Sequence, residues 1–496
     1  MNDILLHERI RCPGLLDKVM DAKDAALIVK EGMVIGCSGF TTAGFPKAVP
    51  QAVAKQGTAG NLTLITPAST GAELDGALAK AGLVSKRYSF QSNADMRRSI
   101  NQGKVDFMDI HLSQVSKYLA SGCLGHLNVA IIECCLITEE CGIVPTTSLG
   151  ISNSLVQYAD QVILEINTTC PAELYGIHDV YPVQIGSGIP IQSPADRIGE
   201  SAIKCSPDKI AAIVFSDQIG STPVFKEPDA VSSAIAGHII TFLKNEVAAG
   251  RLPEDLAPLQ SGVGAVGNAV FAGLKTAGFQ GLTMYTEVVQ DSSLELVKEG
   301  VIDMASTTSL SLSESGLKEL YSDLSFYKKH VVLRPQDISN HPEPIKRLGV
   351  IAINTAAEID IYGNVNSTHA TGSSIINGIG GSGDFSRNAR LSIFMTPSTG
   401  KNGALSRIVP MATHVDNCEH DVNIVVTEFG IADLRGKCPR ERVQDIIENC
   451  AHPNYRPLLR TYYERACEKA SGMQTPHDLS TCFDMHRRYM ETGSML

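Results

Sequence analysis

Short, continuous apolar runs alternate with helix-like stretches along the whole chain. The runs are residues 34–37, 62–66, 129–133, 161–166, 210–215, 282–287, 350–354, 390–395 and 423–428. Because most of them are apolar throughout rather than at every second residue, they suit strands whose two faces are both buried, as in parallel sheets. Helical patterns lie between them, for example residues 230–246 with Asp229 as the N-cap. The alternation predicts an α/β fold with largely parallel sheets.

The length and one proline-containing segment indicate two domains. The chain has 496 residues, which is enough for two or more domains of about 100–200 residues each. Residues 217–229 contain two prolines, a glycine and few apolar residues, as expected for a loop between domains. We therefore predict an N-terminal α/β domain over residues 1–222 and a C-terminal α/β domain over residues 223–496. A cleft between two such domains is the default place for a site.

Composition and charge argue against several classes of protein. Hydrophobic residues make up 43% of the chain and charged residues 19%, as in a globular protein with apolar cores. No apolar run reaches the roughly 18 residues that a membrane helix needs. The first residues resemble neither a secretory signal nor a transit peptide. The formal net charge of −11 argues against a nucleic-acid partner.

The thirteen cysteines indicate a reducing compartment. They are scattered, none forms a Cys-x-x-Cys motif, and many lie inside apolar segments such as residues 131–135. This pattern is typical of buried, reduced thiols rather than of a zinc ribbon or a thioredoxin-type site. We therefore expect a cytoplasmic protein whose cysteines are reduced.

Two glycine-rich segments are candidates for contact with a ligand. Residues 377–385 carry Gly378, Gly380 and Gly383 at the spacing of a dinucleotide fingerprint. A polar stretch precedes them, however, where that fingerprint needs a buried strand. We therefore favour a loop whose N–H groups face developing charge, with a flexible surface loop as the alternative. Residues 260–268 resemble a glycine turn before a helix, where N–H groups can meet phosphate or an oxyanion.

Four glutamates stand at or near the ends of predicted strands, namely Glu133, Glu165, Glu287 and Glu428. Ligand chemistry in open α/β sheets collects at the carboxyl ends of the strands. A carboxylate there can act as a base, an acid, a metal ligand or a nucleophile, and only the nucleophile forms a covalent intermediate. The residues alone do not rank the four.

Two further segments carry polar groups. Asn340 precedes a proline-containing loop, where a side-chain amide either stabilises an oxyanion or serves turn chemistry. Residues 414–421 are rich in His, Asp and Glu, but their spacing matches no zinc signature. We therefore expect solvated or hydrogen-bonded loop residues there, and no metal site.

Several motifs together resemble one known family. They are residues 38–47 (SGFTTAGFPK), 260–264 (QSGVG), 285–291 (YTEVVQD), 333–340 (LRPQDISN), 358–369 (EIDIYGNVNSTH), 377–385 (NGIGGSGDF), 408–411 (IVPM), 426–436 (VTEFGIADLRG) and 492–496 (TGSML). The set resembles the acetyl-CoA hydrolase/transferase family, and within it the succinyl-CoA:acetate and propionyl-CoA:succinate CoA-transferases. The resemblance spans nearly the whole chain and is most specific from about residue 260 onward.

The resemblance implies a fold, an activity and a mechanism. It implies two open α/β domains of the CoA-transferase type, with the active site at their interface, in a homodimer. It implies a CoA-transferase that moves CoA between short carboxylic acids, succinate with acetate or propionate. The family's catalytic glutamate falls on Glu287, which attacks the acyl-CoA thioester and then carries CoA as a glutamyl-CoA thioester. A short acyl-CoA hydrolase with the same intermediate and a catalytically silent CoA-binding module are the alternatives.

The family's other site residues map onto positions of this chain. Asn340 and Gly381 match an oxyanion hole, and Glu428 matches a carboxylate that organises the acid pocket. Ser69 and Thr70 are expected near the acid-binding end. The expected CoA contacts are Gly262, Val263, Gly264, Ala265, Val266, Ala357, Asn377, Gly381 and Lys401. CoA and acyl-CoA are substrates in this scheme, so we expect no metal and no tightly bound cofactor.

Two positions depart from the family's pattern. Residues 216–223 contain no Arg, although relatives often carry one in this loop, and Thr42 stands where relatives commonly have Pro. Both positions fall in the half that is expected to shape the acid pocket. The resemblance therefore does not imply how the carboxylate of the acid is recognised.

Overall fold

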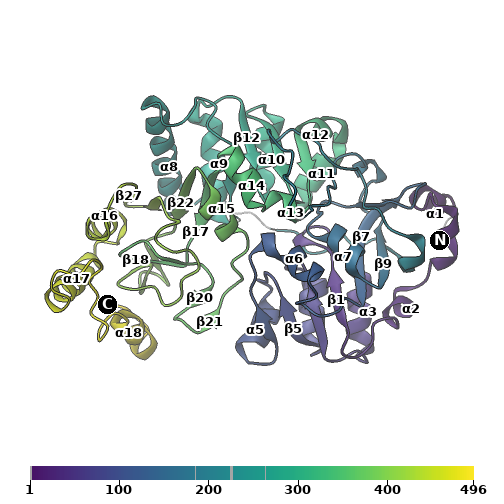
Figure 1. Cartoon of the computed structure of the whole chain (residues 1–496), viewed down its shortest axis with the longest axis horizontal. Coiled ribbons are helices and arrows are strands. Elements are labelled where there is room, and N and C mark those ends of the chain that lie inside the picture. The colour runs from purple at the N-terminus through teal and green to yellow at the C-terminus, as the bar shows by residue number, and fades with distance from the viewer. Residues whose placement is uncertain (1–2, 185, 224–226, 263) are drawn as a thin grey trace. The chain divides into compact units, whose positions relative to one another are not determined.

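The computed structural model describes residues 3–184, 186–223, 227–262 and 264–496, and its elements are labelled in Figure 1. The chain forms two compact units. Unit 1 comprises Met1–Phe225 and Thr283–Leu348, and unit 2 comprises Lys226–Leu282 and Gly349–Leu496. The segment Thr283–Leu348, which the predicted division assigns to the C-terminal half, thus belongs to unit 1. The domain boundary between residues 222 and 223 stays a prediction.

Unit 1 is an α/β structure. Its strands are β1 Val34–Cys37, β2 Phe40–Thr41, β3 Leu62–Ile65, β4 Ala68–Ser69, β5 Val84–Tyr88, β6 Asp106–Met108, β7 Val129–Ile137, β8 Ile143–Pro145, β9 Gln161–Asn167, β10 Ile210–Ser216, β12 Leu282–Tyr285, β13 Val288–Val289, β14 Ile302–Thr307, β15 Ser309–Leu310 and β16 Val331–Leu333. Its helices are α1 Asp3–Arg9, η1 Pro13–Lys18, α2 Ala22–Ala26, α3 Ala48–Gln56, η2 Ala72–Gly76, α4 Ala77–Lys80, α5 Ala94–Asn101, η3 Leu112–Gln114, α6 Val115–Ala120, α7 Ser152–Tyr158, η4 Ala172–Leu174, η5 Pro207–Lys209, α10 Asp291–Lys298, α11 Glu314–Ser322, α12 Leu324–His330, α13 Gln336–Ser339 and α14 Pro342–Leu348.

The large sheet of unit 1 has the strand order β10-β9-β7-β1-β3-β5-β6. Every neighbouring pair in this order is parallel, and β8 adds an antiparallel partner to β7. Val129 and Ile131 of β7 pack into one apolar core, whereas Ala130 and Ile132 pack into another. Both faces of the sheet are therefore buried, which explains why its strands are continuous apolar runs.

The order of these strands reverses between β1 and β7. From β1 the chain runs outward through β3, β5 and β6, and then returns to the other side of β1 as β7, β9 and β10. The crevice beyond the carboxyl ends of two strands at such a reversal is the preferred ligand site in open α/β sheets. The segment after β1 and the residues of β7 are therefore expected to border a binding cavity.

The Thr283–Leu348 part of unit 1 carries a smaller set of strands. β16, β14 and β12 lie side by side in that order, and the short strands β13 and β15 form a separate parallel pair. The pairing of β13 with β15 begins directly after Glu287, since Val288 is opposite Ser309. This local pairing fixes the backbone on the C-terminal side of the candidate nucleophile.

Unit 2 has its own parallel strands. They are β11 Leu259–Ser261, β17 Ile351–Thr355, β18 Glu358–Asp360, β19 Val365–Asn366, β20 His369–Ala370, β21 Ser374–Ile375, β22 Leu391–Met395, β23 Thr399–Gly400, β24 Leu405–Ser406, β25 Ile408–Val409, β26 Ile424–Thr427 and β27 Gly430–Asp433. Its helices are α8 Ala230–Ala248, α9 Ala265–Ala277, α15 Ser382–Asn388, α16 Pro439–Cys450, α17 Arg456–Lys469 and α18 Asp484–Thr492. The strands β11, β17, β22 and β26 are parallel neighbours, and β27 closes the row antiparallel to β26.

The predicted secondary structure is confirmed at the level of elements. All nine apolar runs contain strands, with ends that differ by up to a few residues from the predicted ends. Asp229 is the N-cap of α8, and its side chain accepts a hydrogen bond of 2.7 Å from the N–H of Ser232. Among the described residues, no helix is both long and apolar enough to cross a membrane.

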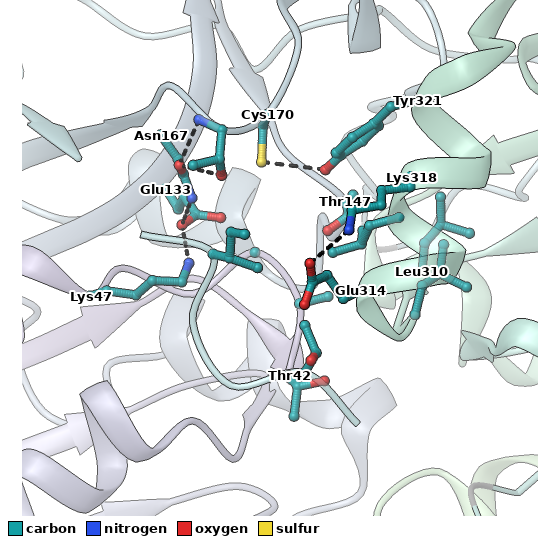
Figure 2. Close-up of a pocket in the computed structure, with 17 residues that line it drawn as sticks. Thr42, Lys47, Glu133, Thr147, Asn167, Cys170, Leu310, Glu314, Lys318 and Tyr321 are labelled. Carbon is teal, nitrogen blue, oxygen red and sulfur yellow. Dashed lines mark hydrogen bonds and ion pairs between the residues drawn. The ribbon is translucent and has the colours of Figure 1, made fainter. Parts of the chain in front are cut away.

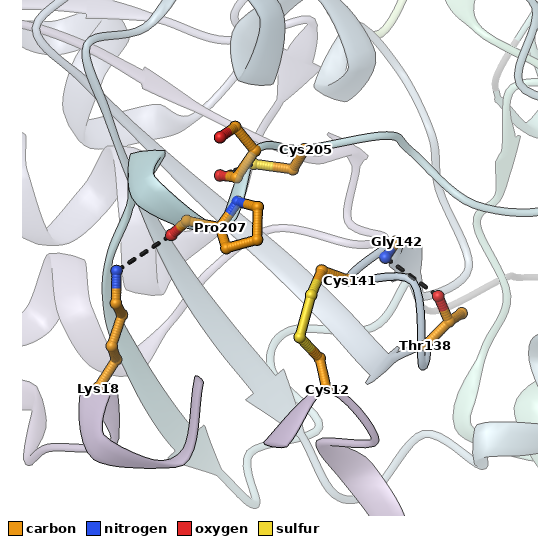
Figure 3. Close-up of a disulfide and its surroundings, with 8 residues drawn as sticks. Cys12, Lys18, Thr138, Cys141, Gly142, Cys205 and Pro207 are labelled. Atoms are coloured by element: carbon orange, nitrogen blue, oxygen red, sulfur yellow. Dashed lines mark hydrogen bonds between the residues drawn. A yellow bond between two sulfur atoms is a disulfide. The ribbon is translucent and has the colours of Figure 1, made fainter. Parts of the chain in front are cut away.

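One expectation about the cysteines is wrong. Cys12 and Cys141 form a disulfide that joins the start of η1 to the turn before β8 (Figure 3), and their Cα atoms are 5.3 Å apart. The pair is separated by 129 residues in the sequence, and no spacing rule predicts such a pairing. The eleven other cysteines are free, so the reduced state expected from the sequence holds for these alone.

Glu246 near the end of α8 makes unit 2 sensitive to acid. Its carboxylate accepts hydrogen bonds from Arg251 at 2.7 and 2.9 Å and from Arg435 at 2.8 and 3.1 Å. These bonds, first those from Arg251 and then those from Arg435, lower the pKa of Glu246 to about 2. A carboxyl whose pKa is lower in the folded than in the unfolded chain stabilises the fold above its ordinary pKa. That contribution is lost as the pH falls from about 4.5 towards about 2.

We expect Glu246→Gln to lower the free energy of unfolding by about 1–3 kcal/mol at pH 7, because charged hydrogen bonds are lost. The difference in unfolding free energy between Glu246→Gln and the parent should become smaller below about pH 4.5. Denaturant unfolding at several pH values measures this difference. Glu200→Gln is the control, because Glu200 forms an ion pair with Lys204 while 65% of its side chain is exposed. If the loss of unfolding free energy in Glu246→Gln stayed constant down to about pH 3, the Glu246 carboxylate would not be the source of the acid sensitivity.

Candidate functional site

Glu287 follows the carboxyl end of β12, as predicted. The strand ends at Tyr285, and Glu287 lies half-buried between β12 and β13. Its backbone carbonyl accepts hydrogen bonds from the hydroxyl of Thr307 (2.8 Å) and from the N–H groups of Thr308 (3.2 Å) and Ser309 (3.1 Å). The main chain is therefore held on the neighbouring segment, while the side chain remains partly accessible.

Asn340 contacts the Glu287 carboxylate directly. Its amide Nδ2 donates a hydrogen bond of 2.6 Å to Oε1 of Glu287, although the two residues are 53 positions apart. The Asn340 side chain is fully buried, and its Oδ1 atom has no hydrogen-bond partner among the residues that the structure describes. A buried amide with a fixed N–H direction can stabilise negative charge on a carboxylate or on an oxyanion formed from it.

The short helix α13 positions Asn340. Nε2 of Gln336 donates to the carbonyl of Leu112 at 2.7 Å, and the Tyr285 hydroxyl donates to the carbonyl of Ile338 at 2.6 Å. Asp337 is buried and accepts a hydrogen bond from Ser154 at 3.1 Å. Burial raises the pKa of Asp337, which the bonds from neighbouring hydroxyls oppose. The helix is thus anchored on several sides, which preorganises the Asn340 amide towards Glu287.

The glycine turn of unit 2 joins a strand to a helix, as its sequence indicates. The N–H of Gly262 donates to the carbonyl of Ile353 at 2.8 Å, and Gly264, with φ 140°, is the N-cap of α9. Ala265 and Val266 begin this helix of 13 residues. Val263 lies outside the described residues. The N–H groups at the start of a helix suit an anion, so the contacts of this turn with CoA stay a prediction.

Glu428 holds the base of a hairpin in unit 2. Its carboxylate accepts hydrogen bonds from the N–H (2.8 Å) and the hydroxyl (2.6 Å) of Ser398, directly before β23. The hairpin β23–β24 carries Lys401 and Asn402 at its tip, with φ of 51° and 54°. Residues other than glycine rarely adopt this left-handed conformation. The tip exposes Lys401 to solvent, where an ammonium could meet a phosphate of CoA.

Three more predicted contacts lie in unit 2. The carbonyl of Ala357 accepts a hydrogen bond of 3.1 Å from Nη1 of Arg407, which the sequence analysis did not single out. Asn377 donates to the carbonyl of Gly378 at 2.8 Å, and Gly381 is the N-cap of α15. The glycine loop follows β21, a two-residue strand of an antiparallel hairpin. It therefore lacks the buried parallel strand that a dinucleotide fingerprint needs.

Ser69 and Thr70 lie at β4 of unit 1. Ser69 is fully buried, and its hydroxyl donates to the carboxylate of Asp75. Thr70 is half-buried, and its N–H donates to the carbonyl of Thr41 at 2.9 Å. The structure thus gives Ser69 a local partner, and the contact of both residues with an acid stays a prediction.

A cavity of about 170 Å³ lies at the reversal point of the large sheet in unit 1 (Figure 2). For comparison, an apolar cavity of about 150 Å³ binds benzene, so this one suits a small molecule. Its lining includes Thr42, Lys47, Glu133, Thr147, Asn167, Cys170, Ile219, Thr222, Leu310, Leu312, Glu314, Lys318 and Tyr321. Neither Glu287 nor Asn340 is among the lining residues. Both departures from the family pattern, Thr42 and the loop 216–223, do border it.

The charges of this cavity are paired internally. Lys47 forms a buried ion pair with Glu133, which also accepts hydrogen bonds from Thr146 at 2.8 Å and Asn167 at 3.1 Å. Burial alone lowers the pKa of Lys47, but the Glu133 carboxylate outweighs it and the pKa lies above its ordinary value. Burial raises the pKa of the Cys170 thiol to about 11, so the thiol stays protonated at neutral pH. These groups therefore offer neither an unpaired cation nor a thiolate.

The structure separates the four strand-end glutamates that the sequence could not rank. Glu165 is fully buried and accepts hydrogen bonds from three N–H groups at the start of α3, at 2.7, 3.0 and 3.0 Å. Glu133 forms an ion pair with Lys47, and Glu428 accepts a hydrogen bond from Ser398. Glu287 is half-buried and accepts a hydrogen bond from the buried amide of Asn340, whereas Glu133, which accepts one from Asn167, is fully buried and paired with Lys47. That environment is the one suited to developing charge.

The segment 414–421 forms local contacts. The rings of His414 and His369 lie against each other at a tilt of 35°, with their centroids 4.0 Å apart. Asp416 accepts hydrogen bonds from the N–H of Ser367 (2.6 Å) and from the N–H and hydroxyl of Thr368 (3.0 and 2.9 Å). Across the described part of the chain, no group of three or more His, Cys, Asp or Glu side chains is arranged to hold a metal ion.

Comparison with solved structures supports the fold. RipA from Yersinia pestis superposes with a TM-score of 0.70 at 22% sequence identity, covering 95% of this chain and 99% of that chain. At this identity the likeness shows the fold. That fold is an α/β protein with parallel sheets in both units.

Two family models match most of the chain and identify its family. The acetyl-CoA hydrolase/transferase N-terminal domain matches residues 9–214, and the C-terminal domain of the same family matches residues 316–463. The chain belongs to the acetyl-CoA hydrolase/transferase family, and it is an enzyme of that family.

Curated relatives of this chain include both transferases and hydrolases. It is 48% identical to a succinyl-CoA:acetate CoA-transferase of Clostridium kluyveri, over 99% of this chain and 92% of the relative. It is 41% identical to an acetyl-CoA hydrolase of Schizosaccharomyces pombe, over 99% of this chain and 98% of the relative. These relatives agree on the family, but they include both transfer to an acid and hydrolysis, so they do not decide between the two activities.

Proposed function

We propose that the protein is a CoA-transferase that moves CoA between short carboxylic acids through a covalent intermediate on Glu287. The observation that carries the proposal is the 2.6 Å hydrogen bond from the buried Asn340 amide to the half-buried Glu287 carboxylate. A carboxylate that only stabilises the fold has no need of an accessible position. A nucleophile needs both access to the substrate and a fixed direction of attack.

In the first half-reaction, a Glu287 carboxylate oxygen attacks the carbonyl carbon of the acyl-CoA thioester. The C–S bond breaks, giving an acyl–glutamyl anhydride and the CoA thiolate. The thiolate then attacks the glutamyl carbonyl of the anhydride, and the first acid leaves as its carboxylate. CoA is now bound to Glu287 as a thioester, and no proton or outside energy source has been consumed.

In the second half-reaction, the acceptor carboxylate attacks the glutamyl-CoA carbonyl, which forms a new anhydride and releases the CoA thiolate. The thiolate attacks the acyl carbonyl of this anhydride. The new acyl-CoA forms, and the Glu287 carboxylate is regenerated. Each attack passes through a tetrahedral oxyanion, for which we propose Asn340 and Gly381 as donors.

The remaining residues have proposed binding roles. The turn of Gly262, Gly264 and Ala265 would present N–H groups to CoA, and Lys401 would contact a CoA phosphate. Glu428 would organise the acid pocket. Binding of the remote parts of CoA then contributes to positioning the thioester at Glu287. A homodimer and a cytoplasmic location belong to the same proposal.

Succinate with acetate or propionate is the proposed acid pair. It is supported by the 48% identity to a succinyl-CoA:acetate CoA-transferase. The 41% identity to an acetyl-CoA hydrolase supports a second candidate, in which water replaces the acceptor acid. The two candidates share the glutamyl-CoA intermediate and differ in whether water reaches it.

An acceptor panel separates these candidates. One labelled acyl-CoA is incubated with the enzyme and succinate, acetate, propionate, butyrate or no acid, and the new acyl-CoA and the free thiol are both measured. We expect transfer to at least one acid to exceed thiol release in water by about 100-fold or more, since a transferase must exclude water from its intermediate. Thiol release without acid at the rate found with acid would favour the hydrolase instead.

A further inference from the structure

The two fully buried arginines of unit 1 show how this protein normally accommodates a buried guanidinium. Arg87 forms an ion pair with Asp75 (2.9 Å) and also donates to Thr66 (2.6 Å). Arg334 forms an ion pair with Asp179 and donates to Ser306 (2.7 Å). Both arginines also donate to backbone carbonyls. A buried cation needs such partners, because leaving one unpaired is strongly unfavourable.

Arg407 of unit 2 is half-buried and differs from these two arginines. It lies between β24 and β25, and its Nε atom is buried without a hydrogen-bond partner among the described residues. Nη1 donates to the carbonyl of Ala357 at 3.1 Å, and the described residues give the guanidinium no ion pair like those of Arg87 and Arg334. A guanidinium has five N–H donors and stays protonated in proteins. Most of the hydrogen-bonding capacity of Arg407 is therefore not used within the described chain.

The surroundings of Arg407 place this spare capacity beside predicted site residues. Burial lowers the pKa of Arg407, and the negative charge of Glu428 opposes that effect. Glu428 itself accepts its hydrogen bonds from Ser398. A Cβ atom built on Gly400 would lie 3.5 Å from Nη2 of Arg407, so the guanidinium packs against the hairpin that carries Lys401.

We propose that Arg407 binds the carboxylate of the short acid and is a specificity-determining residue of the transfer reaction. The inference rests on the proposed function. A carboxylate would accept two N–H bonds from the guanidinium fork, which is the geometry that favours arginine over lysine. It would also supply the negative charge that Arg87 and Arg334 obtain from Asp75 and Asp179. The loop 216–223, which lacks arginine, cannot supply such a fork.

A carboxylate fits this position better than a phosphate of CoA. The exposed cation of the hairpin is Lys401, at its tip, whereas Arg407 is recessed at its base with Nε buried. A phosphate carries more charge than a carboxylate and would be repelled more strongly by Glu428, the acid that acts on Arg407. The cavity of unit 1 is a weaker candidate, because its Lys47 is already paired with Glu133.

The acid dependence of discharge and the affinity for free CoA separate the possible outcomes for Arg407→Gln. Formation of the glutamyl-CoA adduct uses acyl-CoA alone, whereas its discharge needs the acceptor carboxylate. Because the first acid leaves as a carboxylate at the same site, adduct formation from acetyl-CoA should weaken by a factor similar to discharge by acetate, whereas the affinity for free CoA should stay within about 2-fold of the parent. The concentration of acetate or propionate that gives half-maximal discharge should rise about 10- to 100-fold, as for the loss of a charged hydrogen bond.

Arg407→Lys keeps the charge but loses the fork, and we expect a smaller rise, of about 3- to 10-fold. This variant also preserves a test if Arg407→Gln does not fold. Arg487→Gln is the matched control, because it removes an arginine of unit 2 whose side chain is 66% exposed, and we expect it to behave like the parent.

Three results would overturn the inference. Unchanged discharge by acids in Arg407→Gln would show that Arg407 does not contact the acid. Weakened adduct formation with unchanged acid dependence would assign Arg407 to a CoA phosphate. Equal weakening of discharge by acids and of free-CoA binding would indicate a structural role. Absence of the adduct in the parent enzyme is a different result, because it contradicts the proposed function itself.

Discussion

Glu287→Ala is expected to lower the rate of CoA transfer by at least about 10⁴-fold, the scale on which loss of a nucleophile acts. The side chain supplies the atom that forms the covalent bond, so no neighbouring group can replace it at the same position. Glu287→Asp should retain a carboxylate but withdraw it by one methylene, with a loss of about 100-fold. Initial rates of acyl-CoA formation with saturating substrates measure both effects.

Glu299→Ala is the matched control for this prediction. Glu299 lies at the C-cap of α10 in the same unit and is exposed to solvent. Its removal should leave the transfer rate within about 2-fold of the parent, as for a surface substitution away from the site. If Glu287→Ala retained more than about 1% of the parent rate while remaining folded, Glu287 would not be the nucleophile.

Asn340→Ala is expected to lower kcat by about 10²- to 10³-fold, the usual effect of removing one oxyanion donor. KM for acyl-CoA should change by only a few fold, because the amide contacts the reacting carboxylate rather than the remote parts of CoA. Asn340→Asp should be at least as harmful. It keeps the size of the side chain but removes the N–H group, and it places a second carboxylate near the position that is now 2.6 Å from Glu287.

Asn454→Ala tests whether this loss is specific. Asn454 is exposed in unit 2, and its replacement should leave both kcat and KM unchanged. A large rise in KM for Asn340→Ala with an unchanged kcat would show that the amide binds the substrate rather than the transition state. In that case the hydrogen bond to Glu287 would be a feature of the resting enzyme alone.

Much of the fold could be predicted from the sequence because the strands are buried on both faces. Each of the nine apolar runs contains a strand, and the cap at Asp229 follows from local side-chain chemistry. The grouping of Thr283–Leu348 with unit 1 could not be predicted. Long-range packing decides which strands pair, and local secondary-structure propensity does not predict that pairing. The Cys12–Cys141 pair was missed for the same reason.

The candidate site shows the same limit. Four glutamates share one sequence signature, a carboxylate at or near the end of an apolar run. They differ only in their distant partners, which are Lys47 for Glu133 and Asn340 for Glu287. Family resemblance identified Glu287 and Asn340 separately, and the structure brings them within one hydrogen bond. Arg407 has no sequence signature, since its distinguishing feature is an unused N–H group in a buried place.

The most direct test of the account is the mass of the peptide that contains Glu287 after the enzyme has been incubated with acyl-CoA and no acceptor. We predict that this peptide gains CoA as a thioester, that addition of acetate removes it, and that Glu287→Ala shows no such gain. Transfer that proceeds without any CoA adduct, or with an adduct that persists in Glu287→Ala, would contradict the proposed mechanism.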